Sequence, residues 1–476
     1  MRLFSALLLI AVSAWAQDAG LVLSTYVNYV TEISSASLSP EKRAELDAAA
    51  RTAMGLNAQK QHGEALRILH RGLAEMRGFT WSPARAFATG LVFRADHAVW
   101  EPGQKVRLSA KRLYPNEPGA PESTRAVVAL GDTQLGDWVI SGDSAQLMVT
   151  VPAGVASGNG IVNVQVPPLQ VPKTIAVAIQ PGLRARAESL SARVAKLTTQ
   201  PGTALWTAQY GPELFRRVDV GELALANFDL AKEIADGQAL VTRLEAGERA
   251  IAPAAARDMR FAYLSNVDNT LQPYRLYLPK TWRAGQSYPL VMALHGMGGD
   301  ENTLFARYGE RVMLNEADKQ GFIVAAPKGR QPASMYRDAA EQDVLDVLKQ
   351  VRADYSIDNA RIYMMGHSMG AYGTWSIAMA HPELFAALGP IAGGGDPAGM
   401  EKIRTIPQIV IHGDNDKTVA VTQSRMMVEA AKKLGVLLEY VEVPGGSHNG
   451  VAAPAFGPIF SFFAAHPKKA AAGAGN

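Results

Sequence analysis

The sequence predicts a doubly wound α/β domain with a mostly parallel sheet, preceded by a small β-sandwich and helical segments. Three observations predict this fold. From about residue 257 to 467, short apolar runs alternate with helical stretches. These runs are continuously apolar, as strands are when helices cover both faces of a parallel sheet. The chain has 476 residues, more than one compact core usually organises, so several domains are expected.

The composition limits the classes of function. With 48% hydrophobic and 19% charged residues, the chain resembles ordinary soluble globular protein. The net charge of +3 gives no reason to expect nucleic acid as a partner. The sequence has no cysteine, which excludes disulfides, thiolate metal ligands and cysteine nucleophiles.

Residues 1–16 are typical of a signal peptide. Arg2 supplies the positive charge, Leu3–Val12 is a short apolar run, and Ala14–Ala16 fits the small-x-small cleavage rule. The apolar run is about half the roughly 20 residues that a spanning helix needs, so no membrane anchor is expected. We therefore expect a secreted or periplasmic protein, cleaved near Ala16.

The front of the chain divides by composition. Residues 17–88 predict a helical segment, with one helix beginning at Ser39-Pro40, because serine caps a helix and proline suits its first position. Residues 89–181 contain short β-rich runs separated by Gly, Pro, Asn and Asp, which predict a small antiparallel sandwich. Residues 182–256 predict a helical connector.

Two aromatic residues of the sandwich segment allow two interpretations. Tyr114 and Trp138 are candidates for a sugar-binding platform, or they belong to the core. Aromatic residues in a small sandwich are more often core, so the second interpretation is favoured.

The elements of the C-terminal domain follow from its alternating pattern. Strands are expected at 274–279, 289–296, 321–327, 361–368, 386–393, 407–413 and 438–444. Helices are expected at 302–319, 339–353, 371–381 and 421–434, with a last helix ending near Ala465. Residues 468–476 are expected to form a disordered tail.

The pentapeptide Gly366–Gly370, with the pattern GxSxG, follows one predicted strand and opens a helix. In this context it predicts a nucleophile elbow, a sharp turn that exposes the Ser368 hydroxyl at the carboxyl edge of the sheet. The turn also places the backbone N–H of Met369 at a helix N-terminus, where donors are unpaired and stabilise developing negative charge. The alternative is an ordinary glycine-rich turn with a capping serine.

A serine nucleophile needs a base, and the base needs an orienting carboxylate, in the chain order Ser, Asp or Glu, His. Asp416 follows an apolar strand in the run IVIHGDND, with Asp414 as its competitor. His448 lies in a glycine-rich loop between the last predicted strand and the last helix. The other histidines of the domain have simpler structural explanations. We therefore predict Ser368, His448 and Asp416 as a catalytic triad.

Further site residues are predicted around this triad. The run HGMGG follows a strand and can supply a second oxyanion donor, the backbone N–H of Met297. Tyr372 and His367 are predicted to contact substrate. Tyr336 and Trp375 are also candidates for the pocket wall, although a core position is favoured for Trp375.

No cofactor or metal is expected. Asp300, Glu301, Asp414 and Asp416 are acidic residues of neighbouring loops, but their spacing matches no ligand set.

Residues from about Tyr274 to His466 resemble secreted α/β-hydrolase esterases of the prolyl-oligopeptidase-like group. They are similar to feruloyl and acetyl esterases and to polyhydroxybutyrate depolymerases, above all in the run IDNARIYMMGHSMGAYGTWSIAMAHPELFAALGPIAGGGDP. The resemblance implies the α/β-hydrolase fold, the triad above, and an oxyanion hole formed by Met297 and Met369. Some such relatives carry an immunoglobulin-like domain in front, so residues 89–181 are expected to form one.

The expected function is therefore carboxylic ester hydrolysis through an acyl-enzyme, on aryl, acetyl or feruloyl esters, either small or polymer-linked. One alternative is a serine peptidase, although peptidases similar to this group usually carry a large β-propeller for which the front segment is too short. The other is a non-catalytic carbohydrate-binding protein, against which the complete triad counts. The sequence makes no prediction of oligomeric state.

Overall fold

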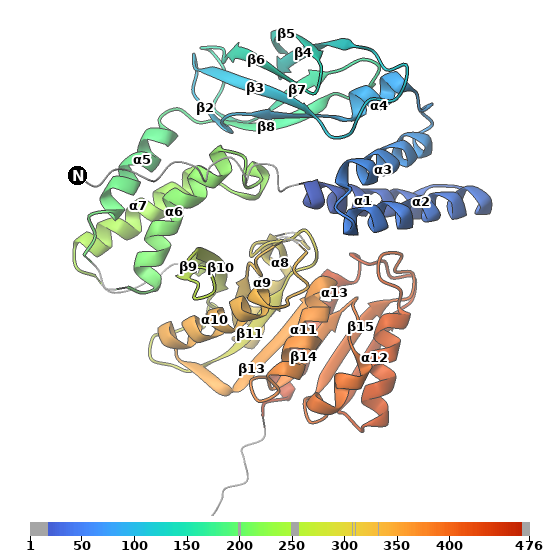
Figure 1. Ribbon diagram of the computed structural model, residues 1–476. Coiled ribbons are helices and arrows are strands. Elements are labelled where there is room, and N and C mark those ends of the chain that lie inside the picture. The colour runs from blue at the N-terminus through green and yellow to red at the C-terminus, as the bar shows by residue number, and fades with distance from the viewer. Residues whose placement is uncertain are drawn as a thin grey trace, which may run out of the picture. The chain divides into compact units, whose positions relative to one another are not determined.

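A computed structural model describes residues 18–198, 201–248, 257–306, 308–309, 311–331 and 333–468. The predicted signal peptide and the tail after Lys468 lie outside these residues. The chain divides into two compact units, Met1–Arg193 with Gly211–Gln238, and Val194–Tyr210 with Ala239–Asn476. The segment predicted as a connector contributes to both, because the unit boundaries fall inside α6 (Thr203–Asp219) and α7 (Leu230–Glu245). Its remaining helices are α5 (Leu183–Val194) and the short η2 (Leu225–Asn227) (Figure 1).

The first unit begins with helices α1 (Asp18–Ser35), α2 (Pro40–Ala58) and α3 (His62–Met76) (Figure 1). The predicted start of α2 is confirmed, because the Ser39 side chain accepts a hydrogen bond from the Lys42 N–H and Pro40 is the first helical residue. The three helices share a core of buried apolar residues, which includes Val22, Tyr29, Leu46, Leu66 and Leu69. A short helix, α4 (Pro83–Thr89), follows.

Two sheets follow α4 and share one core, which makes them a β-sandwich. One sheet has the order β1 (Leu91–Ala95), β3 (Lys105–Arg112), β6 (Ser144–Thr150). The other has the order β2 (Val99–Trp100), β8 (Lys173–Ile179), β7 (Gly158–Gln165), β4 (Ser123–Leu130), β5 (Thr133–Ser141). All pairs are antiparallel except β2 with β8.

The two aromatic residues considered for a sugar platform belong to the interior of this unit. Trp138 is 2% exposed and meets Phe93 edge to face, and Tyr114 is 4% exposed. Buried rings offer no stacking surface to a sugar, so the core interpretation is correct.

The second unit contains an eight-stranded sheet of the order β16-β15-β14-β13-β11-β12-β10-β9. Neighbours from β16 to β12 are parallel, whereas β10 is antiparallel to both β12 and β9. The strands span β9 (Asp258–Leu264), β10 (Leu271–Tyr277), β11 (Tyr288–Leu294), β12 (Ile323–Pro327), β13 (Ile357–His367), β14 (Ala387–Ile391), β15 (Gln408–Gly413) and β16 (Leu438–Val443). This is an α/β-hydrolase sheet, as predicted.

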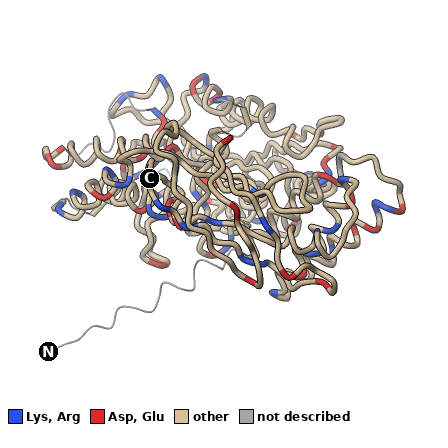
Figure 2. The backbone as a smooth tube through the Cα atoms, turned by 90° about the horizontal axis from the view of Figure 1, so that it is seen from above, with Lys and Arg blue, Asp and Glu red and all other residues tan. Residues whose placement is uncertain are grey.

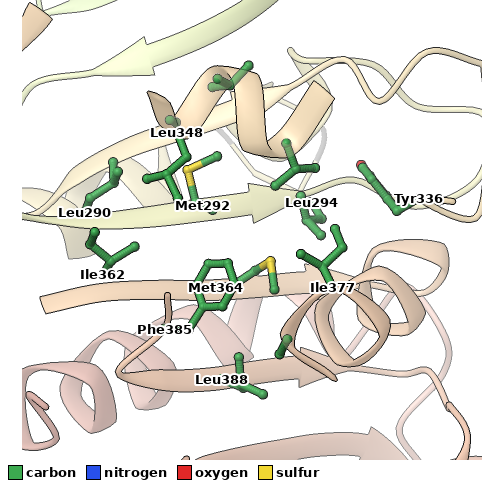
Figure 3. Packing of buried hydrophobic residues seen from close by; sticks show 14 of the residues in the cluster. Leu290, Met292, Leu294, Tyr336, Leu348, Ile362, Met364, Ile377, Phe385 and Leu388 are labelled. Carbon is green, nitrogen blue, oxygen red and sulfur yellow. The ribbon is translucent and has the colours of Figure 1, made fainter. Parts of the chain in front are cut away.

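Helices cover both faces of this sheet, which explains why its strands are apolar on both sides. One face packs against α10 (Ala339–Asp354), α11 (Met369–Ala380), η3 (Pro397–Ile403) and α12 (Thr422–Lys433). The other packs against α8 (Thr303–Ala306), α9 (Val312–Gln320) and α13 (Ala452–Ala465). Figure 3 shows Leu290, Met292 and Leu294 of β11 among the side chains of the first face, while Val291 and Ala293 belong to the second.

The single helix predicted for 302–319 is wrong, because the structure has two helices there. Gly309, between α8 and α9, has a φ of 105°, which interrupts the helical backbone. The strand β9 was also absent from the predicted elements, since its run DMRFAYL contains two charged residues and lies at the sheet edge.

Charged residues of both signs are interspersed along the chain (Figure 2), which agrees with the small net charge. Among the described residues, no helix has the length and apolar character needed to cross a bilayer.

Candidate active site

The predicted nucleophile lies in a strained turn between β13 and α11. Ser368 has φ 57° and ψ −118°, a conformation that costs free energy for any residue with a Cβ. The flanking glycines are required sterically. A Cβ on Gly366 would overlap the backbone of Gly370, and one on Gly370 would overlap the carbonyl of Leu294. The half-buried Ser368 therefore stands where the parallel strand ends and the helix begins.

Three side chains from separate loops meet at this turn. His448 Nε2 lies 2.9 Å from Ser368 Oγ, and His448 Nδ1 lies 2.6 Å from Asp416 Oδ2. Asp416 comes from the loop after β15, and His448 from the loop between β16 and α13. The Asp416 side chain is 0% exposed and that of His448 is 11% exposed, so the carboxylate is sealed from solvent behind the imidazole.

The competing carboxylate, Asp414, lies outside this chain of hydrogen bonds. Its Oδ1 accepts the backbone N–H of Gly445 at 2.7 Å and so fixes the neighbouring turn. The structure therefore brings Asp416 to His448 and leaves Asp414 with a local structural contact.

The carboxylate of Asp416 is held by several donors. Oδ1 accepts the backbone N–H groups of Thr418 and Val419, at 2.8 and 2.9 Å. His412 Nε2 lies 3.1 Å from Oδ2. Burial alone would raise the pKa of the Asp416 carboxyl, but its hydrogen bonds with His412 and His448 outweigh burial and keep this pKa well below its usual value. The group is therefore ionised at neutral pH.

His367 does not have the position expected of a substrate-binding residue. It is 1% exposed, its Nδ1 lies 2.8 Å from the Tyr308 hydroxyl, and its Nε2 lies 2.9 Å from the carbonyl oxygen of His448. A buried ring that uses both nitrogens within the protein cannot line a binding pocket. Its position next to the elbow instead ties the His448 loop to β13, which corrects the prediction.

The remaining aromatic candidates differ in burial. Tyr372 is half-buried one helical turn after Ser368, and its hydroxyl lies beside Gly394, where a Cβ would stand 3.1 Å away. Burial, followed by the charge of Asp416, raises the pKa of its phenol. Tyr336 is fully buried against Gly329 and Gly373 and cannot line a pocket. Trp375 is also fully buried, as favoured, and its indole N–H donates to Gln408.

The loop with the predicted second oxyanion donor lies against the elbow. A Cβ on Gly296 would stand 3.3 Å from Cβ of Ser368, so this backbone passes directly beside the nucleophile. Met297 follows in that loop, and Met369 is the first residue of α11, where backbone N–H groups lack partners within the helix. Both backbones are therefore close to Ser368.

Acidic and histidine side chains do not gather into a metal site anywhere in the described part of the chain. Glu301, one of the acidic residues considered, is 1% exposed and lies 3.0 Å from Arg260 in an ion pair.

Comparison with known proteins gives one family match. The Esterase family, described as "Putative esterase", matches residues 265–402. The part of the chain that this family model matches is therefore similar to esterases. This match includes Ser368 but ends before Asp416 and His448.

Curated relatives are similar to part of the chain. A "Bifunctional acetylxylan esterase/xylanase XynS20E" of Neocallimastix patriciarum is 30% identical over 131 residues, 27% of this chain and 19% of that protein. A "Probable feruloyl esterase C" of Aspergillus flavus is 28% identical over 188 residues, 37% of this chain and 68% of that protein. The alignment with the first thus spans less than a fifth of that protein's length. By their names, both of these relatives are esterases.

Solved structures with a similar backbone include a thermostable esterase, at 19% identity and a TM-score of 0.41, covering 80% of this chain and all of that one. A ferulic acid esterase from Anaeromyces mucronatus has 17% identity and a TM-score of 0.37, covering 45% of this chain and 93% of that one.

Sequence reasoning missed three supporting side chains, His412, Tyr308 and Ser424. His412 lies between Asp416 and the Ser424 hydroxyl, which is 2.7 Å from its Nδ1. Its position four residues before the acid was visible in the sequence, but nothing there indicated that the loop folds back onto its ring. Tyr308 is 59 residues from His367, and no local pattern connects them.

Proposed function

We propose that this chain is an exported serine carboxylic ester hydrolase that uses Ser368, His448 and Asp416 through an acyl-enzyme. The observation that carries the proposal is the continuous hydrogen-bonded line from Ser368 Oγ through the imidazole to Asp416. Its geometry is that of a nucleophile, a general base and an orienting carboxylate.

The roles follow from the atoms in contact. An ionised Asp416 accepts the Nδ1–H of His448, which leaves Nε2 unprotonated and facing the serine hydroxyl. Nε2 takes the serine proton as Oγ attacks the ester carbonyl. The resulting oxyanion accepts hydrogen bonds from the backbone N–H groups of Met297 and Met369. His448 then returns the proton to the leaving alcohol. Water, deprotonated by the same nitrogen, attacks the acyl-serine ester, and the proton passes back to Ser368 as the acid is released.

We propose aryl, acetyl or feruloyl esters as substrates, either small or attached to a polymer. The named activities of the acetylxylan and feruloyl esterases similar to this chain support that class. Tyr372, which is half-buried on α11 one turn after Ser368, is the aromatic side chain proposed to contact the acyl group.

Two further expectations remain proposals. Export agrees with the character of residues 1–16, and an immunoglobulin-like identity for the sandwich agrees with its two sheets around one core.

The test is hydrolysis of p-nitrophenyl acetate and methyl ferulate by mature protein, beside Ser368→Ala. Ser376→Ala is the matched control, because this serine is exposed on the same helix. We expect loss of at least about 10³-fold in kcat for Ser368→Ala and an unchanged rate for the control. A folded Ser368→Ala protein with the wild-type rate would refute the proposal.

A further inference from the structure

The first unit contains a pocket that the proposed ester hydrolysis does not use. Its volume is about 350 Å³, within the range of small-molecule sites. Its wall is built from α1, the end of α3, the segment through α4, and the loop between β7 and β8. All of these elements belong to one compact unit.

Three cations line this pocket, and none of its lining residues is acidic. Arg77 is neutralised by Glu32, 2.7 Å away. Lys173 donates to the Thr89 carbonyl oxygen at 2.9 Å. Cations at a pocket wall that lack an acidic partner favour an anionic ligand.

Like Lys173, Arg85 is a cation of the pocket wall whose hydrogen bonds go to uncharged oxygens. It donates to the Thr80 carbonyl and to Oε1 of Gln170, each at 3.1 Å, and its guanidinium stacks on the Phe79 ring. Within the described chain, the side-chain hydrogen bonds of Arg85 and Lys173 thus go to neutral oxygens. Arg85 is 8% exposed, so packing holds this guanidinium in place.

Burial lowers the pKa of two residues that line the pocket. Burial lowers the pKa of the Lys173 ammonium to about 8. Burial, and then the charges of Lys173 and Arg77, lower the pKa of His70 to about 3, so this ring is neutral. The part of the His70 shift that Lys173 and Arg77 cause agrees with positive charge at this wall, whereas the Lys173 shift reflects burial alone.

The rest of the wall is largely apolar. Leu73, Phe79, Leu169 and Pro172 contribute hydrocarbon surface beside the cations. An inorganic ion would leave this surface facing water, whereas an organic ligand would cover it. We propose that this pocket binds a small organic anion, a carboxylate with an apolar body, through Lys173 and Arg85. This inference does not rest on the proposed ester hydrolysis.

The test is calorimetric titration of the full mature chain with 3-phenylpropanoate, with neutral 3-phenylpropanamide, and with inorganic phosphate. Lys173→Gln removes the charge but keeps a donor for Thr89, and Lys105→Gln, at an exposed site on β3, is its control. Asn28→Trp fills the pocket from an exposed wall position.

We expect 3-phenylpropanoate to bind wild type and Lys105→Gln alike, and to bind Lys173→Gln and Asn28→Trp about tenfold or more weaker. The amide and phosphate are expected to bind much more weakly than the carboxylate. Binding of 3-phenylpropanoate that is unchanged in Lys173→Gln, or an amide that binds as well as the acid, would overturn the inference that the pocket prefers an anion. Phosphate that binds as tightly as 3-phenylpropanoate would overturn the inference that the ligand has an apolar body.

Discussion

At the scale of single residues, the site depends on how each side chain of the triad is held. Ser368 is fixed by a strained backbone, Asp416 by two backbone donors, and His448 by the acid and by its own carbonyl oxygen. Of these restraints, the hydrogen bond to the His448 carbonyl oxygen takes no part in the proposed reaction, so it can be altered separately from the triad.

Asp416→Asn removes the charge that orients and stabilises His448. We expect kcat/KM to fall about 10³–10⁴-fold, as for comparable changes in other serine hydrolases. Asp414→Asn is the matched control, and its rate should stay within a few-fold of wild type. Equal losses in both variants would contradict the assignment of Asp416.

The low pKa of Asp416 also makes a prediction about stability. A carboxyl whose pKa is lower in the folded state stabilises that state above its unfolded pKa of about 3.9, and this contribution is lost as pH falls toward the folded value. The melting temperature of wild type should therefore exceed that of Asp416→Asn at pH 7, and the gap should narrow below about pH 4. Thermal melts across this range check it, and a gap independent of pH would contradict the direction of the pKa shift.

Tyr308 is predicted to act as a positioning residue through His367. Tyr308→Phe removes one hydrogen bond of that ring, whose other nitrogen bonds to the His448 carbonyl. We expect kcat to fall about tenfold with little change in KM, because the base is displaced while the binding surface remains. Tyr440→Phe, which loses a hydroxyl bonded to Glu442 on β16, is the control. A loss confined to KM would indicate that Tyr308 contacts substrate.

At the scale of elements, the turn between β13 and α11 can form only because its backbone passes close to that of β11. Gly370→Ala places a methyl group against the Leu294 carbonyl of β11, so we expect loss of activity together with a lowered melting temperature. Gly55→Ala is the contrasting change, because this helical glycine has open space around its Cα, and alanine there should stabilise α2 by roughly 0.5–1 kcal/mol. A Gly370→Ala enzyme with normal activity would refute the steric account.

Much of this element pattern was predictable from sequence. The apolar runs from β10 to β16 and the GxSxG turn are local signals, since periodicity and glycine placement lie within a few residues of each other. Edge strand β9 and the break at Gly309 depend on tertiary context. His367 was wrongly expected at the substrate because sequence adjacency to Ser368 does not show which way a ring points, and in this strand it points into the protein.

At the scale of the whole molecule, two units carry two kinds of chemistry. The second holds the proposed ester hydrolase, and the first holds a cationic pocket of a different composition. Because the triad mechanism uses only side chains and backbone donors, EDTA and dithiothreitol should leave the rate of ester hydrolysis unchanged. An EDTA-sensitive rate that Zn²⁺ or Ca²⁺ restores would contradict that mechanism.

The central claim is that Ser368 forms the covalent acyl-enzyme, and active-site labelling tests it most directly. Mature protein is treated with a fluorophosphonate, digested, and the modified residue is identified by mass spectrometry. The account predicts one adduct per chain, on Ser368, with loss of esterase activity in proportion to labelling. Full inactivation by an adduct on another serine, or full activity in protein labelled at Ser368, would contradict it.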